Sequence, residues 1–104
     1  MIRYDEDTKT LTVCPSGELD QHMAEKIRNT IDSEILKSGA KKLIFDMNEI
    51  PFMDSSGIGM LIGRYKLMKR LMGQVEVTGM KDSVTRIFRM SGLNQIIKVI
   101  ERAK

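Results

Sequence analysis

The stretch Pro51-Phe-Met-Asp-Ser-Ser-Gly-Ile-Gly-Met60 lies near the middle of the sequence and separates two apolar segments of different kinds. Residues 43–45, before it, form a short unbroken apolar run, which is typical of a buried β-strand. After it, apolar residues recur at helical spacing from Ile58 onward. The stretch is therefore predicted to join a strand to a helix, with Ser55 and Ser56 near the helix start. Unpaired N–H groups and the helix dipole make that position favourable for an anion, including a phosphate on either serine.

The segments before the junction predict a hairpin, a helix and a central strand. Residues 1–4 and 11–15 are predicted to form two short strands that are close enough in the chain for antiparallel pairing. A helix follows, with Asp20 as its N-cap and Gly39 at its C-terminal end. The apolar run within residues 42–47 predicts a parallel strand that is buried on both faces and reached by a right-handed crossover.

The segments after the junction continue the alternation of helices and strands. The helix of the junction is expected to span about residues 56–72, with Gly73 ending it. A short strand at residues 75–77 comes next, and Asp82 or Ser83 is the expected cap of a third helix.

The last apolar segment, residues 96–100, fits either a strand or a short helix. A chain of 104 residues is long enough for one compact domain and too short for two. We therefore predict a single small α/β domain over residues 1–104, with an N-terminal antiparallel hairpin, a mixed and mostly parallel sheet of four to five strands, and about three to four helices.

The helix after the junction is apolar over an arc of about 220°, wider than one packed face needs. The simpler explanation is that the helix lies between the sheet and a neighbouring helix. Alternatively, an edge formed by Met60, Leu67 or the glycines Gly59 and Gly63 is exposed for a partner.

Composition excludes several classes of protein. The net charge of +3 is mild and spread over both signs, and aromatic residues are few, so nucleic-acid binding is not expected. No apolar run approaches the ~20 residues of a membrane span. The charged start of the sequence does not resemble a signal peptide, which predicts a cytoplasmic protein without membrane contact. The single cysteine, Cys14, is expected to be a buried free thiol.

No enzyme chemistry is predicted. His22 is the only histidine, it lies near a helix start, and the serine pair lacks the glycine spacing of a nucleophile elbow. Neither a phosphate-binding loop nor a dinucleotide fingerprint occurs, so no cofactor is expected. The carboxylates of Asp46, Glu49 and Asp54 resemble solvated loop acids more than a Mg²⁺ site, so no metal is expected.

A receiver-like domain phosphorylated on Asp46 is an alternative from another class. Such a domain needs a second acidic pair after a buried first strand, whereas residues 5–7 follow a hairpin-like strand. The chain is also short for five alternating strand and helix units.

Three motifs together resemble a known family. Residues 52–66, FMDSSGIGMLIGRYK, resemble the signature of the anti-sigma factor antagonists, which are bacterial members of the STAS domain family. GELD at residues 17–20 and MSGL at residues 90–93 are similar to two further segments of that family. The pairing of DSSG with GRYK points to the sporulation subgroup.

This resemblance implies a partner-switching role without catalytic activity. The expected partner is an anti-sigma factor that is also a serine kinase and carries ADP or ATP. The unphosphorylated antagonist would bind this kinase and release the sporulation sigma factor. Phosphorylation of the first serine of DSSG, Ser55, would end the binding until a serine phosphatase removes the phosphate. From the residues alone, a capping role for Asp54 with both serines in the first turn is the simpler explanation.

The docking surface is expected at one edge of the sheet. Loops that follow parallel strands emerge at the same edge, which would bring Glu18 and Asp20 beside the junction, although Asp20 is equally suited to capping. The predicted partner-binding residues are Glu18, Asp20, Asp54, Ser55, Ser56, Gly57, Gly59 and Met60. A general STAS interaction module of another stress pathway, in which the serine is only structural, remains the alternative.

Overall fold

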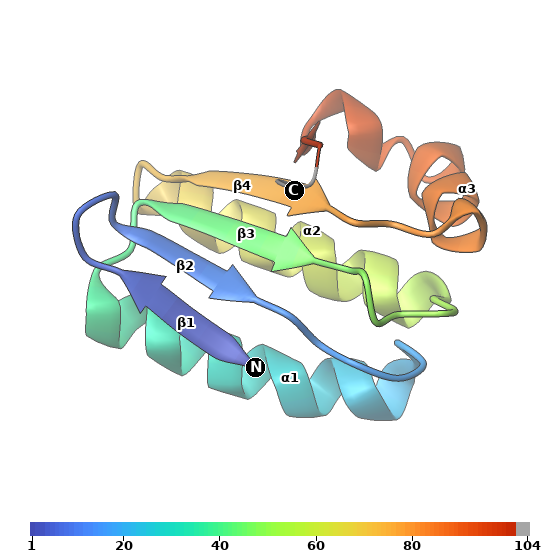
Figure 1. The fold of residues 1–104 in the computed structure, drawn as a ribbon, viewed down its shortest axis with the longest axis horizontal. Helices are drawn as coiled ribbons and strands as arrows, with labels where there is room; N and C mark the ends of the chain where they lie inside the picture. The colour runs from blue at the N-terminus through green and yellow to red at the C-terminus, as the bar shows by residue number, and fades with distance from the viewer. Residues whose placement is uncertain (102–104) are drawn as a thin grey trace.

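Five strands form one sheet whose spatial order follows the chain, in a computed structural model that describes residues 1–101 (Figure 1). The strands are β1 (Ile2–Asp5), β2 (Thr10–Val13), β3 (Lys42–Asp46), β4 (Gln74–Thr78) and β5 (Lys98–Val99). β1 is antiparallel to β2, and each later pair of neighbours is parallel. The predicted hairpin and the mixed, mostly parallel sheet are therefore confirmed.

Helices connect the parallel strands. They are α1 (Gln21–Ser38), α2 (Ser55–Arg70) and α3 (Asp82–Met90), followed by the short 3₁₀ helix η1 (Leu93–Gln95). α1 and α2 lie side by side across one face of the sheet, and α3 lies beyond the carboxyl end of β4 (Figure 1). None of the helices in residues 1–101 is both long enough and apolar enough to cross a lipid bilayer.

The core lies between the sheet and the pair α1 and α2. Alternate strand residues in register, such as Leu11, Leu43 and Val75, are buried on the face that these helices cover. The other face is more polar: Ile44 is only half-buried, and Lys42 Nζ lies 3.4 Å from Oε2 of Glu76, which is itself buried, as is Thr78. The prediction that residues 42–47 are buried on both faces is therefore wrong, because both long helices pack on the same side.

Helix boundaries agree with the capping signals in α1 and differ in the later helices. Asp20 Oδ1 accepts the Met23 N–H at 3.0 Å, and Gly39 ends α1 in the left-handed region with φ 70°. α2 ends at Arg70, and Met72, not Gly73, has the positive φ, of 62°. Gly73 is required for a different reason, since a Cβ there would lie 2.8 Å from the Lys41 carbonyl oxygen.

α3 begins without a side-chain cap. Its N-cap position is Lys81, so the prediction of a cap from Asp82 or Ser83 is wrong. Asp82 lies in the first turn, and Ser83 Oγ instead donates to the carbonyl oxygen of Pro51 at 3.0 Å. This hydrogen bond ties α3 to the loop that leads into α2.

The last apolar segment contains a strand, β5, and not a helix. Val99 of this strand is exposed, whereas Ile97, which directly precedes the strand, is buried. Cys14 is free as expected, but it is half-buried and not fully buried.

Candidate phosphorylation and docking site

Two loops lie side by side at the carboxyl edge of the sheet. The Leu19 N–H donates to the Phe52 carbonyl at 2.9 Å, and the Gly17 N–H donates to the Glu49 carbonyl at 3.1 Å. Leu19 also forms a parallel bridge with Met53. The loop that contains Glu18 therefore lies next to the loop that leads into α2, as the parallel strands predicted.

The start of α2 is capped by Asp54. Its Oδ1 accepts the Ser56 N–H at 2.8 Å, and its backbone carbonyl accepts the Gly57 N–H at 3.0 Å. The capping role inferred from the sequence is confirmed. Two of the N–H groups that were expected to be free for a phosphate are thus already bound to Asp54.

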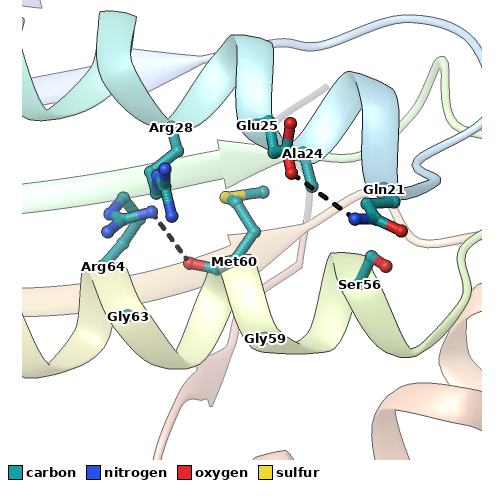
Figure 2. A pocket seen from close by; sticks show the side chains of 9 residues that line it. All are labelled: Gln21, Ala24, Glu25, Arg28, Ser56, Gly59, Met60, Gly63 and Arg64. Carbon is teal, nitrogen blue, oxygen red and sulfur yellow. Dashed lines mark hydrogen bonds between the residues drawn. The ribbon is translucent and has the colours of Figure 1, made fainter.

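The two serines have different surroundings. Ser55 is exposed, whereas Ser56 is half-buried and lies on the side of α2 that faces α1. Figure 2 shows Ser56 directed toward Gln21 at the end of a groove between the two helices. Ser55 is therefore the more accessible hydroxyl of the pair.

The glycines after the serines are not equivalent. Gly57 is buried, and a Cβ there would overlap the Met53 side chain and lie 3.0 Å from Leu19 Cγ. Gly59 is exposed, and a Cβ added to it would have no other atom within 4 Å. Gly57 therefore holds α2 against the two loops, whereas Gly59 belongs to an open edge.

The apolar arc of α2 is mostly covered. Met60 is only 4% exposed, between α1 and α2, and Leu67 is half-buried. The simpler explanation, that α2 lies between the sheet and the neighbouring helix α1, therefore accounts for Met60. The part of α2 that is open to a partner is the edge with Gly59, while Met60 is not the exposed contact that its place among the partner-binding residues implied.

The two acidic residues of the neighbouring loop, Glu18 and Asp20, differ in exposure. Glu18 is exposed, whereas Asp20 is half-buried and uses one oxygen to cap α1. The exposed members of the predicted set are thus Glu18, Ser55 and Gly59, with Asp20, Asp54 and Ser56 partly covered.

A charged cluster between α1 and α2 was not predicted from the sequence. Arg64 is 7% exposed, and its Nε lies 2.7 Å from Asp32 Oδ1, an ion pair without the geometry of a hydrogen bond. Its Nη1 donates to the Met60 carbonyl at 3.4 Å (Figure 2). Burial lowers the pKa of Arg64; Asp32 opposes this shift, and the nearby Arg28 adds to it.

These arginines close one end of the groove, whose volume is about 240 Å³. Its α1 wall includes Gln21, Glu25 and Arg28, and its α2 wall includes Gly59 and Gly63. The sequence offered one signal, an arginine inside the wide apolar arc of α2, but the Asp32 partner on another helix was not identifiable from spacing.

Neither a metal site nor a receiver-like site is formed. Within residues 1–101 no three acidic, histidine or cysteine side chains are grouped to hold a metal ion, so Asp46, Glu49 and Asp54 do not converge. Asp46 Oδ1 accepts the Asn48 N–H at 3.1 Å. The strand order β1-β2-β3-β4-β5 also differs from the 2-1-3-4-5 order of flavodoxin-like folds such as receivers, which excludes that alternative.

The sheet order, the helix pair and the DSSG helix start together define a STAS domain. A STAS domain profile matches residues 1–103, and the chain belongs to this family.

Within this family, the chain is similar to several antagonists of anti-sigma factors. An anti-sigma F factor antagonist from Paenibacillus polymyxa is 33% identical over 100 residues, which is 96% of this chain and 86% of the relative. An anti-sigma-B factor antagonist from Listeria monocytogenes is 28% identical over 95 residues, 91% of this chain and 82% of the relative. The solved structure of the Bacillus cell fate determinant SpoIIAA in its phosphorylated form has a TM-score of 0.74 and 25% identity, covering 100% of this chain and 93% of that one.

Proposed function

We propose that this protein is an anti-sigma factor antagonist that is switched off by phosphorylation of Ser55. In its unphosphorylated form it binds an anti-sigma factor that is also a serine kinase, and so frees a sporulation sigma factor. A serine phosphatase restores the binding form. The protein acts in the cytoplasm as ligand and substrate, with no catalysis of its own.

The observation that carries this proposal is the exposure of Ser55 at a capped helix start, beside an exposed edge of the same helix. A kinase must bring the hydroxyl to its nucleotide, which requires an accessible side chain. The similarity to a protein solved in a phosphorylated form supports the same assignment.

The switch follows from charge at a docked surface. A phosphate adds about −1.5 to −2 charges at neutral pH. Asp54 already binds the Ser56 N–H, so the phosphate of Ser55 would add its charge to that of the Asp54 carboxylate. A partner site that is acidic or carries a nucleotide would face both negative charges when it docks here, and like charges brought together at an interface weaken binding. The fold itself need not change, because the helix dipole favours anions at this end.

The direct test is incubation with a sporulation anti-sigma kinase and ATP, followed by mass mapping. We expect one phosphate, on Ser55. Ser55→Ala should bind the kinase and accept no phosphate, whereas the matched variant Ser56→Ala should be phosphorylated as the wild type. Phosphate on Ser56, or elsewhere in Ser55→Ala, would refute the assignment.

A second variant tests the electrostatic mechanism. Ser55→Asp should weaken kinase binding about tenfold or more, with unchanged thermal unfolding, because the added carboxylate stands beside Asp54. Isothermal titration calorimetry measures the affinity. Wild-type affinity in Ser55→Asp would show that charge at this position does not control docking.

A general STAS module of another stress pathway is the second candidate. The similarity to anti-sigma-B factor antagonists favours it as a specific alternative. Parallel titrations with a sporulation anti-sigma kinase and with an anti-sigma-B kinase distinguish the two, since the cognate partner should bind more tightly.

A further inference from the structure

β1 is an edge strand with an unpaired outer side. It pairs with β2 alone, and no strand within residues 1–101 covers its other side (Figure 1). The opposite edge, β5, is only two residues long. A strand edge that exposes backbone N–H and C=O groups is a ready surface for pairing with another strand.

The hydrogen bonds at the start of β1 show which backbone groups point outward. Met1 N donates to the Cys14 carbonyl at 2.9 Å, and Cys14 N donates to the Met1 carbonyl at 2.8 Å. Hydrogen-bonded and non-hydrogen-bonded pairs alternate along an antiparallel ladder, so Arg3 also directs its backbone groups toward β2. Ile2 and Tyr4 therefore present their N–H and C=O groups at the free edge.

The side chains of β1 give this edge two different faces. Arg3 and Asp5 lie on the open face of the sheet, where both line the same shallow hollow. Ile2 and Tyr4 lie on the helix side, opposite the buried residues of β2. On that side a hollow of about 180 Å³ adjoins the edge, and Met1 at its rim is 77% exposed. The free edge thus has two opposite charges on one face and partly exposed apolar side chains on the other.

We propose that a second copy of this chain pairs with β1, edge to edge and antiparallel, with Tyr4 opposite Tyr4 across a twofold axis. This register makes the outward backbone N–H and C=O groups of Tyr4 meet those of the partner copy's Tyr4, and it places Ile2 opposite Glu6, in the turn after β1. It also places Arg3 opposite the partner copy's Asp5, twice, in the pair type whose side chains approach most closely. Such a dimer has one continuous ten-stranded sheet.

Charge selects this register over its neighbours. Moving the axis to Arg3 sets the two Arg3 side chains against each other, and moving it to Asp5 sets two carboxylates together. Like charges directly opposite each other destabilise a pair of strands. Moving the axis by one residue in either direction keeps the outward hydrogen-bonding positions but creates one of these like-charge pairs, whereas the register with its axis at Tyr4 has neither.

The dimer is expected to be weak. β1 offers four residues, so the interface belongs to the small, transient class. Sedimentation equilibrium between about 10 μM and about 1 mM, the range of such interfaces, should show reversible dimerisation of the wild type. A wild type that stays monomeric over this range overturns the proposal.

Charge reversal provides the specific test. Arg3→Glu sets Glu against the partner copy's Asp5, and Asp5→Arg sets Arg against Arg3, so each variant alone should dimerise at least about tenfold more weakly than the wild type. An equimolar mixture of the two restores both pairs of opposite charge and should form a heterodimer. Lys66→Glu, the same charge change on an exposed position of α2, should dimerise as the wild type.

A second measurement guards against a folding defect, because Asp5 Oδ1 also accepts the Asp7 and Thr8 N–H groups in the turn after β1. Amide hydrogen exchange of the wild type should show Tyr4 more protected at high than at low concentration, with Arg3 unchanged. Equal exchange of Tyr4 at both concentrations, or wild-type dimerisation of a folded Arg3→Glu, would refute the proposed interface.

Discussion

Ser55 and Ser56 are adjacent in the chain, but the helix turns by about 100° between them, so they face different surroundings. Ser55 is exposed, while Ser56 turns toward α1. Asp54 accepts three backbone N–H groups of the helix start, from Ser56 through its carboxylate and from Gly57 and Ile58 through its carbonyl. At the scale of single residues, the helix start therefore has one accessible hydroxyl, one capping carboxylate and one glycine fixed by packing.

Gly57→Ala should lower the free energy of unfolding by about 1–3 kcal/mol, because the added methyl group overlaps Met53 and crowds Leu19. Gly63→Ala is the matched control: it lies in the same helix with no atom within 4 Å of a Cβ. It should raise stability by about 0.5–1 kcal/mol through helix propensity. Urea unfolding measures both, and equal effects would contradict the packing role of Gly57.

The pair α1 and α2 is held by more than apolar contact. Arg64 of α2 is buried and pairs with Asp32 of α1 at 2.7 Å, while Arg28 adds a second positive charge nearby. A buried cation whose counter-ion is removed retains the cost of desolvation. At the scale of elements, this cluster sets the relative position of the helices and closes the end of the groove.

Asp32→Asn should therefore destabilise the protein, by about 1–3 kcal/mol in thermal or urea unfolding. Arg28→Gln removes a charge that repels Arg64 and should leave stability unchanged or slightly raised. If Asp32→Asn is as stable as the wild type, Arg64 does not depend on this partner.

At the scale of the whole molecule, the proposed docking surface and the proposed dimer surface lie at different edges of the sheet. The loops before α1 and α2 meet at the carboxyl edge of the parallel strands, where Ser55 lies, whereas β1 forms a lateral edge of the same sheet (Figure 1). The proposed dimer uses β1 (Ile2–Asp5), whereas Glu18, Ser55 and Gly59 belong to other segments, so the two proposed surfaces share no side chain.

Phosphorylation should accordingly be independent of dimerisation. Arg3→Glu, which is expected to be monomeric, should accept phosphate on Ser55 at the wild-type initial rate, as followed by mass spectrometry with the cognate kinase. A reduced rate at equal folded concentration would mean that the lateral edge takes part in docking.

Local patterns determined a large part of this structure. Helical spacing, the acidic caps Asp20 and Asp54, and the apolar run of β3 were sufficient to predict the order of elements, because these features depend on neighbours in the chain. The family motifs added the assignment of Ser55. Predictions failed at the N-cap of α3, where a lysine takes the position without a side-chain hydrogen bond, because capping statistics do not fix an individual boundary.

Tertiary structure decided what depends on distant segments. An apolar run does not say which face of β3 will be covered, and both long helices packed on one side, leaving Ile44 half-buried. The burial of Met60, the Arg64–Asp32 pair and the free edge of β1 likewise follow from how helices and strands are arranged in space. The sequence by itself determined the elements and the serine-bearing helix start, whereas exposure and pairing were decided by packing, because both are properties of contacts between segments far apart in the chain.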